Sequence, residues 1–199
     1  VVATSKSMAA QSTKTVVAGW DWSEIDIEAG SNIVLSSVGT KYIKAKINGG
    51  NAGAATIINV MDAGTVYVPQ AVGFSTTEDG DNMSIVWNFP NASNVIIPSS
   101  LTPSYGHIIA PNATITVEGG NYNGCLVGQN MTINAEGHLW PYKGGSLVKP
   151  TSSQFGVLKH VNGATPQSDE NFEFVLEELK NGAWINLQTV SNNGEWVNF

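Results

Sequence analysis

The chain has one cysteine, Cys125, and the chemistry open to it depends on the side chains that lie beside it. Gln129 follows four residues later in the sequence. A thiolate that attacks a glutamine amide releases ammonia and leaves an internal thioester, which an external amine can open to form a covalent link. Gln11, or another distant glutamine, could equally supply the amide. The alternative, which we favour, is a buried unreactive thiol, because free cysteine commonly behaves as a small hydrophobic residue.

Residues that could bind a metal or catalyse acid–base chemistry lack a diagnostic spacing. The three histidines are His107, His138 and His160, and no HxxxH, HxH or CxxC pattern accompanies them. The acidic loop at residues 78–82 lacks the closing glutamate of a calcium loop. We therefore expect no metal, no cofactor and no enzymatic activity. A glycan-processing enzyme stays an alternative if two carboxylates face one groove about 5–10 Å apart. The candidates for it are Asp79, Asp81, Glu118 and Glu136.

Composition restricts the class of partner. Nine basic residues, all of them lysine, stand against 16 acidic ones, and the net charge is -7. This balance excludes a basic nucleic-acid-binding surface and argues against attachment to anionic lipids. Hydrophobic residues make up 42% of the chain, which is enough for a core, while only 13% are charged. Together with the many Gly, Asn, Ser and Thr residues, this indicates a β-rich protein.

An internal repeat of about 20 residues indicates how the strands are organised. Residues 108–116 align with residues 126–134 at an offset of 18, and residues 89–93 align with 110–114 at an offset of 21. The asparagines at the matching positions are Asn91, Asn112 and Asn130. This spacing suits one coil of a β-solenoid, in which asparagines stack as a ladder. The same residues begin Asn-x-Ser/Thr glycosylation motifs, but structural repetition explains their even spacing better.

A change of pattern near residue 149 predicts two domains. The segment from Lys149 to Ser153 reads as a linker, and short alternating runs follow at residues 154–161, 172–176, 184–190 and 195–199. Four strands are too few for an independent sandwich. We predict an all-β protein with a β-solenoid head at residues 1–148 and the beginning of an Ig-like β-sandwich domain at residues 149–199.

Two segments resemble known families. The motifs HIIAPNATIT at residues 107–116, GGNYNG at 119–124 and GHLWPY at 137–142 resemble the choice-of-anchor A domains of Gram-positive surface adhesins. The motifs LKHVNG at 158–163 and FEFVLE at 172–177 resemble the isopeptide-bearing pilin and stalk domains of the streptococcal T-antigen type. These resemblances imply an adhesive head followed by the first stalk module of an extracellular, cell-wall-anchored protein.

The resemblances also imply a function and one further site residue. We expect non-covalent binding of a host or environmental ligand, either a matrix protein or a glycan, without nucleic acid and without membrane insertion. A covalent adhesin that uses Cys125 is the alternative. Lys159 occupies the position of the stalk family's isopeptide lysine, but the family's asparagine and acid lie on later strands, so we expect a solvated lysine. An exposed aromatic set could form a contact surface, although such residues more often belong to the core. Its candidates are Trp20, Trp22, Trp87, Trp140, Tyr105, Tyr122 and Tyr142.

Overall fold

The protein is all-β apart from short helices, as its composition predicts. The computed structural model describes residues 1–37, 40–49, 54–73, 81–101, 104–138, 140–148, 156–157, 159–160, 163–164, 172–180, 182–192 and 197–198. The chain divides into two compact units, Val1–Lys149 and Pro150–Phe199. The described helices are α1 (Val2–Ala10) and the 3-10 turns η1 (Asp81–Ser84) and η2 (Ser99–Leu101). None of them is long and apolar enough to cross a bilayer.

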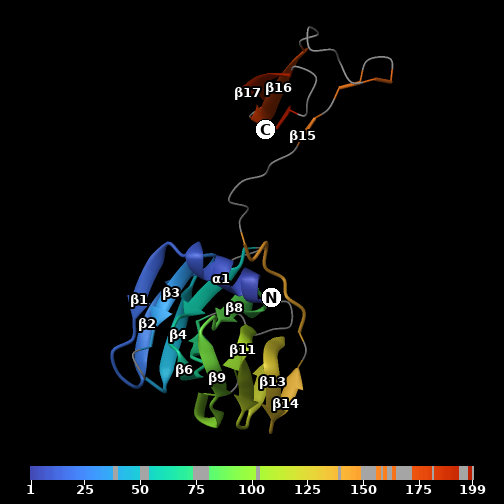
Figure 1. The fold of residues 1–199 in the computed structure, drawn as a ribbon. Coiled ribbons are helices and arrows are strands. Elements are labelled where there is room, and N and C mark those ends of the chain that lie inside the picture. The colour runs from blue at the N-terminus through green and yellow to red at the C-terminus, as the bar shows by residue number, and fades with distance from the viewer. Residues whose placement is uncertain are drawn as a thin grey trace. The chain divides into compact units, whose positions relative to one another are not determined.

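The main sheet of the first unit has eight parallel strands (Figure 1). In spatial order they are β1 (Lys14–Val17), β3 (Asn32–Ser36), β5 (Thr56–Val60), β8 (Ile85–Asn88), β11 (His107–Val117), β9 (Ala92–Ile97) and β6 (Gly64–Tyr67), and β13 (Leu126–Ile133) also pairs with β11. The long strand β11 joins two halves, because its first residues pair with β8 and its last residues pair with β9.

Two smaller parallel sheets complete this unit. One contains β2 (Ser23–Glu28), β4 (Ile43–Asn48) and β7 (Gln70–Val72), and the other contains β10 (Ser104–Tyr105), β12 (Asn121–Asn123) and β14 (Glu136–His138). Between two paired strands of the main sheet, the chain passes through one of the smaller sheets and then returns. Neighbouring strands of the main sheet therefore come from successive segments of the sequence. Parallel pairing of this kind requires long connections, which the other sheets provide.

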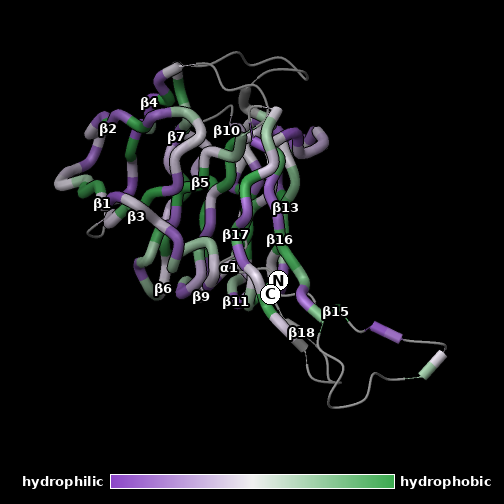
Figure 2. The backbone as a smooth tube through the Cα atoms, turned by 90° about the horizontal axis from the view of Figure 1, so that it is seen from above, coloured by the Kyte–Doolittle hydropathy of each residue, from purple (hydrophilic) through white to green (hydrophobic). Residues whose placement is uncertain are grey.

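Period-two alternation buries one side of strands such as β2 and β4, whereas β5 and β8 are buried on both sides. Polar and apolar residues alternate along the strands (Figure 2), and in β2 the inward Ile25 and Ile27 are buried while their neighbours are exposed. Trp87 is fully buried in this core, and its indole N–H donates to the carbonyl of Tyr105 at 2.9 Å. Gly106 lies directly beside that indole at φ +106, and a Cβ there would come within 2.9 Å of the Trp87 Nε1 atom. A side chain at residue 106 would therefore displace the core tryptophan.

The helix α1 was not predicted, and its physical cause is tertiary packing. It has no side-chain N-cap, but Ser5 and Met8 are buried against the main sheet. Its residues contact strands β3, β5, β8 and β11. Side-chain amides of the sheet reach the helix backbone, since Asn88 Nδ2 donates to the Ser5 carbonyl at 2.8 Å and Asn32 Nδ2 donates to the Met8 carbonyl at 2.9 Å. Nine residues form a marginal helix by themselves, so these contacts stabilise it.

The second unit contains antiparallel strands. β16 (Phe172–Lys180) pairs with β17 (Ala183–Asn192), and β15 (Gly156–Val157) pairs with β18 (Val197–Asn198). The predicted strands at residues 172–176 and 184–190 are confirmed, since the first forms the beginning of β16 and the second lies within β17. Between the last two predicted strands, Asn193-Gly194 is a dipeptide that favours a tight turn, and it lies outside the described residues.

Candidate functional site

One half of the main sheet carries evenly placed, uncharged side chains on its outer surface. In the strands β6, β9, β11 and β13, four residues stand in register as a first rank: Thr65, Asn94, Thr114 and Asn130. Two residues along the same strands, a second rank follows: Tyr67, Ile96, Thr116 and Thr132. In β6, β9 and β11 the intervening Val66, Val95 and Ile115 are buried, so the ranks face outward there, while in β13 the intervening Met131 is exposed as well. We call these eight residues the open face.

The geometry of the open face follows from strand spacing. Neighbouring strands lie about 4.8 Å apart, and residues two apart on one strand lie about 6.6 Å apart. The open face is therefore a regular grid of hydroxyl, amide and aliphatic groups. Thr65, Asn94 and Asn130 are exposed, while Thr114 is half-buried. Asn94 Nδ2 lies 3.5 Å from Thr65 Oγ1, at the limit of a hydrogen bond, so these groups remain available to a partner.

The smaller sheet β2-β4-β7 presents charges instead. Its outward residues pair acids with lysines across the strands, since Glu24 stands beside Lys44 and Asp26 beside Lys46. Asp26 also accepts a hydrogen bond from Asn48 Nδ2 at 2.8 Å. Opposite charges in register stabilise neighbouring strands while remaining hydrated. None of the eight residues of the open face is Asp, Glu or Lys, and the Lys41 ammonium group lies only at its edge, against the Tyr67 ring. This difference singles the open face out as a contact surface.

The asparagines of the repeat do not stack on one another. Asn91 Nδ2 donates to the Met61 carbonyl at 3.0 Å, and Asn112 Nδ2 donates to the Pro90 carbonyl at 3.3 Å. Asn130 stands in register with Thr114, because β11 holds two more residues than β13 between Ala110 and Thr114. The register at the offset of 18 is correct for Ile108 to Ala110, and it changes to 16 after this irregularity.

A buried asparagine ladder does exist, formed by other residues. Asn59 Nδ2 donates to Asn32 Oδ1 at 2.7 Å, and Asn88 Nδ2 donates to Asn59 Oδ1 at 2.7 Å. Asn59 and Asn88 have no exposed surface. The sequence signal that could have found them is an asparagine between two strand residues with large apolar side chains, as in Ile58-Asn59-Val60 and Trp87-Asn88-Phe89.

The structure places Cys125 and Gln129 apart. Cys125 comes directly before β13, and its Sγ lies 3.5 Å from the Trp140 carbonyl. Gln129 is exposed on β13, and four residues of an extended strand span about 13 Å. Gln11 lies at the C-terminal end of α1. The thiol is partly buried, and the thioester stays a prediction.

His107 holds the backbone beside Cys125. Its Nδ1 accepts a hydrogen bond from the Cys125 N–H at 3.2 Å, and its Nε2 donates to the Met83 carbonyl at 3.1 Å. Both ring nitrogens are therefore used by a neutral imidazole. Burial lowers the pKa of His107, and the hydrogen bond to Met83 opposes this effect. The geometry gives His107 a structural contact with the cysteine backbone rather than with its thiol.

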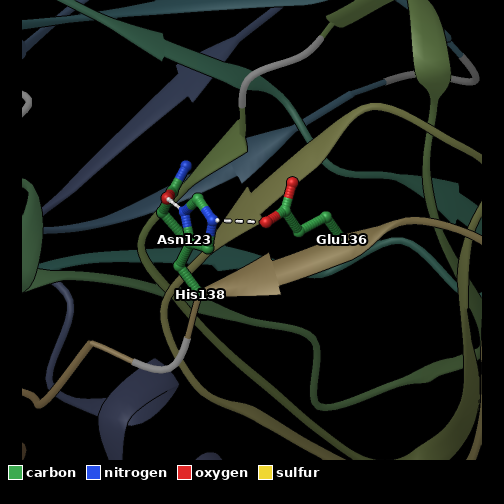
Figure 3. A network of polar contacts seen from close by, with 3 residues as sticks. All are labelled: Asn123, Glu136 and His138. Carbon is green, nitrogen blue, oxygen red and sulfur yellow. Dashed lines mark hydrogen bonds and ion pairs between the residues drawn. The ribbon is translucent and has the colours of Figure 1, made fainter.

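A second histidine forms a polar network at the surface (Figure 3). His138 Nδ1 donates to Asn123 Oδ1 at 2.8 Å, and its Nε2 lies 3.2 Å from Glu136 Oε1. The side chains of β12 and β14 are joined by this network. Across the described residues, no three His, Cys, Asp or Glu side chains gather closely enough to hold a metal ion. His160 is exposed in the second unit.

The structure describes only some of the remaining candidates. Glu118 is exposed after β11. Asp79 lies outside the described residues, and the side chain of Asp81 is not described. Lys159 is exposed in the second unit, and its Nζ lies 4.5 Å from the centroid of the Phe172 ring. Contact with an aromatic face suits a lysine ammonium group.

The comparisons with known proteins give one match. Residues 1–139 match the model of the family described as "Putative Ice-binding-like adhesive domain". No curated protein and no solved structure matches the chain. The match covers the whole open face and all three sheets of the first unit. The match supports an adhesin-type domain. It does not extend to the choice-of-anchor A and T-antigen families that the sequence motifs resemble. Because the matched residues make up more than half of the chain, the protein belongs to the ice-binding-like adhesive domain family.

Proposed function

We propose that the protein is a cell-surface adhesin whose first unit binds an external ligand non-covalently through the open face. The observation that carries this proposal is the pair of uncharged ranks that cross four strands in register. Family membership supports an adhesive role. A host or matrix protein, a glycan or another extended surface is the class of ligand that a regular grid of uncharged groups suits.

The absence of charge on the open face has a physical consequence for binding. Removing a charged group from water is costly unless a partner replaces its hydration. Protein interfaces are accordingly depleted of Lys, Glu and Asp at their centres. Threonine and asparagine lose less hydration, and their hydroxyl and amide groups can bond to a ligand. The open face can therefore come into dry contact with a flat partner, whereas the sheet β2-β4-β7 would first have to shed the hydration of several charges.

The wider architecture is part of the same proposal. Successive parallel strands and repeated registers support a β-solenoid head, and the antiparallel pairs of the second unit support an Ig-like stalk module. We propose that this stalk belongs to an extracellular protein anchored to a Gram-positive cell wall. We propose a non-enzymatic role, and the glycan-processing alternative needs two carboxylates facing one groove.

Adhesion by the full 199-residue chain tests the open face. Fluorescent beads coated with the protein are washed under flow over polycrystalline ice, cellulose, chitin, collagen and fibronectin. We expect retention on at least one surface and loss of that retention in the double variant Thr114→Lys, Thr116→Lys. Lys46→Thr on the charged sheet is the matched control and should retain binding. Thr132→Lys, at a more exposed position, replaces the double variant if that variant does not fold. Beads that bind no surface, or equal retention of all variants, would overturn the proposal.

Measurement of the intact mass of the chain distinguishes the covalent alternative from non-covalent binding. A thioester between Cys125 and a glutamine makes the chain one ammonia lighter than its sequence, and methylamine opens it to give an adduct. A mass deficit that resists methylamine indicates an isopeptide bond at Lys159 instead. We expect the unmodified mass and a thiol that iodoacetamide alkylates after unfolding. This result would leave non-covalent binding as the function.

A further inference from the structure

The structure sorts the aromatic residues of the first unit into two groups. Trp87 and Tyr122 belong to the core, with at most 4% of their surface exposed. Trp20 and Trp22, in contrast, are 71% and 56% exposed. Both lie in the turn that leads from β1 into β2. Two exposed indoles in one turn place a large apolar area in water, and exposed apolar areas of this kind are typical of binding sites.

The backbone of this turn is held in an uncommon conformation. Trp22 has φ +66, and a bulky residue rarely adopts this left-handed region. Three hydrogen bonds fix it. Asp21 Oδ1 accepts from the Lys41 N–H at 2.7 Å, the Trp22 N–H donates to the Tyr42 carbonyl at 2.5 Å, and the Ser23 N–H donates to the Trp20 carbonyl at 3.2 Å. Strained residues that the surroundings hold in place are concentrated at functional sites.

The consequence of this conformation is an aromatic surface. The Trp22 ring stacks on the Tyr42 ring with 4.8 Å between centroids and 18° between planes. Tyr42 supports one side of the indole, and the exposed fraction of Trp22 leaves the rest open to solvent. Lys41, beside Tyr42, has its Nζ 5.6 Å from the centroid of the Tyr67 ring. Asp21 and Lys41 therefore flank the stacked pair along the chain, and the Lys41 ammonium group lies against Tyr67.

We propose that Trp20, Trp22 and Tyr42, the aromatic platform, bind neutral polysaccharides by stacking against the apolar faces of pyranose rings. The C–H groups on one face of a pyranose ring suit the negative face of an aromatic ring. Sugar hydroxyls at the ring edge can bond to Lys41 and Asp21. The rings of this site belong to other residues than the eight of the open face, although Lys41 lies between the two, with its Nζ against the Tyr67 ring.

Charge favours a neutral glycan over other ligands with flat faces. The net charge of -7 opposes polyanions such as nucleic acids and sulfated glycans. The lysine beside Tyr42 opposes a cationic ligand over the ring pair. A neutral saccharide meets neither obstacle, and its rigid rings lose little conformational freedom when they stack on a platform that the turn already holds in place.

Affinity electrophoresis of the full chain tests the platform. Native gels contain glucomannan, xylan or mixed-linkage β-glucan, with heparin as an anionic comparison. We expect retardation by at least one neutral polysaccharide, together with a change in tryptophan emission, and no retardation by heparin. Trp22→Ala should raise the dissociation constant at least tenfold, and Trp20→Ala should raise it less. Trp184→Ala, at an equally exposed tryptophan of the second unit, should leave it unchanged.

Two further variants show whether a loss of polysaccharide binding comes from the aromatic platform itself. Trp22→Asn removes the ring with a residue that tolerates the left-handed conformation, so it separates loss of stacking from loss of the turn. The open-face variant Thr114→Lys, Thr116→Lys should retain polysaccharide binding. No retardation by any neutral polysaccharide, or equal retardation of the Trp22 variants, would overturn the platform. Loss of binding in the open-face variant alone would place the sugar on the open face and equally overturn it.

Discussion

The two halves of the main sheet use asparagine in opposite ways. Beneath α1, Asn59 and Asn88 are buried, and their amides bond to each other, to Asn32 and to the helix backbone. On the uncovered half, Asn94 and Asn130 are exposed in the first rank of the open face. The same residue type on parallel strands is thus part of the fold where a helix covers it. Where nothing covers it, its hydrogen-bonding capacity is available to a partner.

We expect the largest difference in stability between the two halves at Asn59, the central asparagine of the buried ladder. Asn59→Ala removes a side chain that donates to Asn32 and to the Ile33 carbonyl and that accepts from Asn88. Buried groups left without partners cost about 1–3 kcal/mol each, so we expect the free energy of unfolding to fall by about 3 kcal/mol. Urea denaturation followed by circular dichroism measures it. Asn94→Ala is the matched control, with an expected change below about 0.5 kcal/mol. Equal losses would show that the two halves do not differ in this way.

The packing of α1 on the main sheet can be weakened by a substitution in the helix. Met8 of α1 is fully buried and packs with Ile57 and Val86. Met8→Ala should lower the free energy of unfolding by about 2 kcal/mol, since truncating a buried methionine leaves a cavity. Met131→Ala, at a position 45% exposed on β13, should change it by less than about 0.5 kcal/mol. Thermal denaturation of the two variants makes the comparison. A Met8→Ala variant as stable as the wild type would mean that α1 does not contribute to the covered half.

On the open half, a single hydroxyl should affect binding and not stability. Thr116→Val keeps the β-branched shape and removes one hydrogen-bonding group, which is worth about 1 kcal/mol, or about fivefold in affinity. The bead-retention assay measures this change on the surface that the wild type binds. Thr15→Val on the exposed strand β1 is the matched control and should retain full binding. If both variants bind equally well, the second rank is not part of the contact.

The sequence predicts where strands lie more clearly than it predicts which strands pair with one another. Period-two alternation predicts an all-β chain, and the repeat correctly pairs Ile108 with Leu126. The alignment then fails at Asn112, because a gapless repeat cannot contain the two extra residues that β11 holds before Thr114. The ladder at Asn32, Asn59 and Asn88 has offsets of 27 and 29, which lie outside the repeat of about 20 residues.

The candidate site depends on pairing that no single segment specifies. Thr65 and Asn130 belong to one rank only because β9 and β11 lie between their strands. The helix α1 is equally hidden, since its stability comes from Ser5 and Met8 packing on distant strands. The exposed indole of Trp22 follows from a left-handed residue that sequence patterns do not favour. In each case a long-range contact, rather than a local preference, decides the outcome.

The smallest expected effect is the pH dependence of the junction at His107, where β11 meets β8. Burial lowers the pKa of His107 in the folded chain below its ordinary value of 6.5. Between these two values the unfolded chain binds a proton that the folded chain does not, so stability rises with pH. The stability is therefore complete above about pH 6.5 and declines as the pH falls toward the folded-state pKa. His107→Gln should flatten this decline in urea titrations at pH 7.5, 6.5 and 5.5, whereas His160→Gln, at an exposed position of the second unit, should retain it. A decline of unchanged slope in His107→Gln would assign the titration to another group.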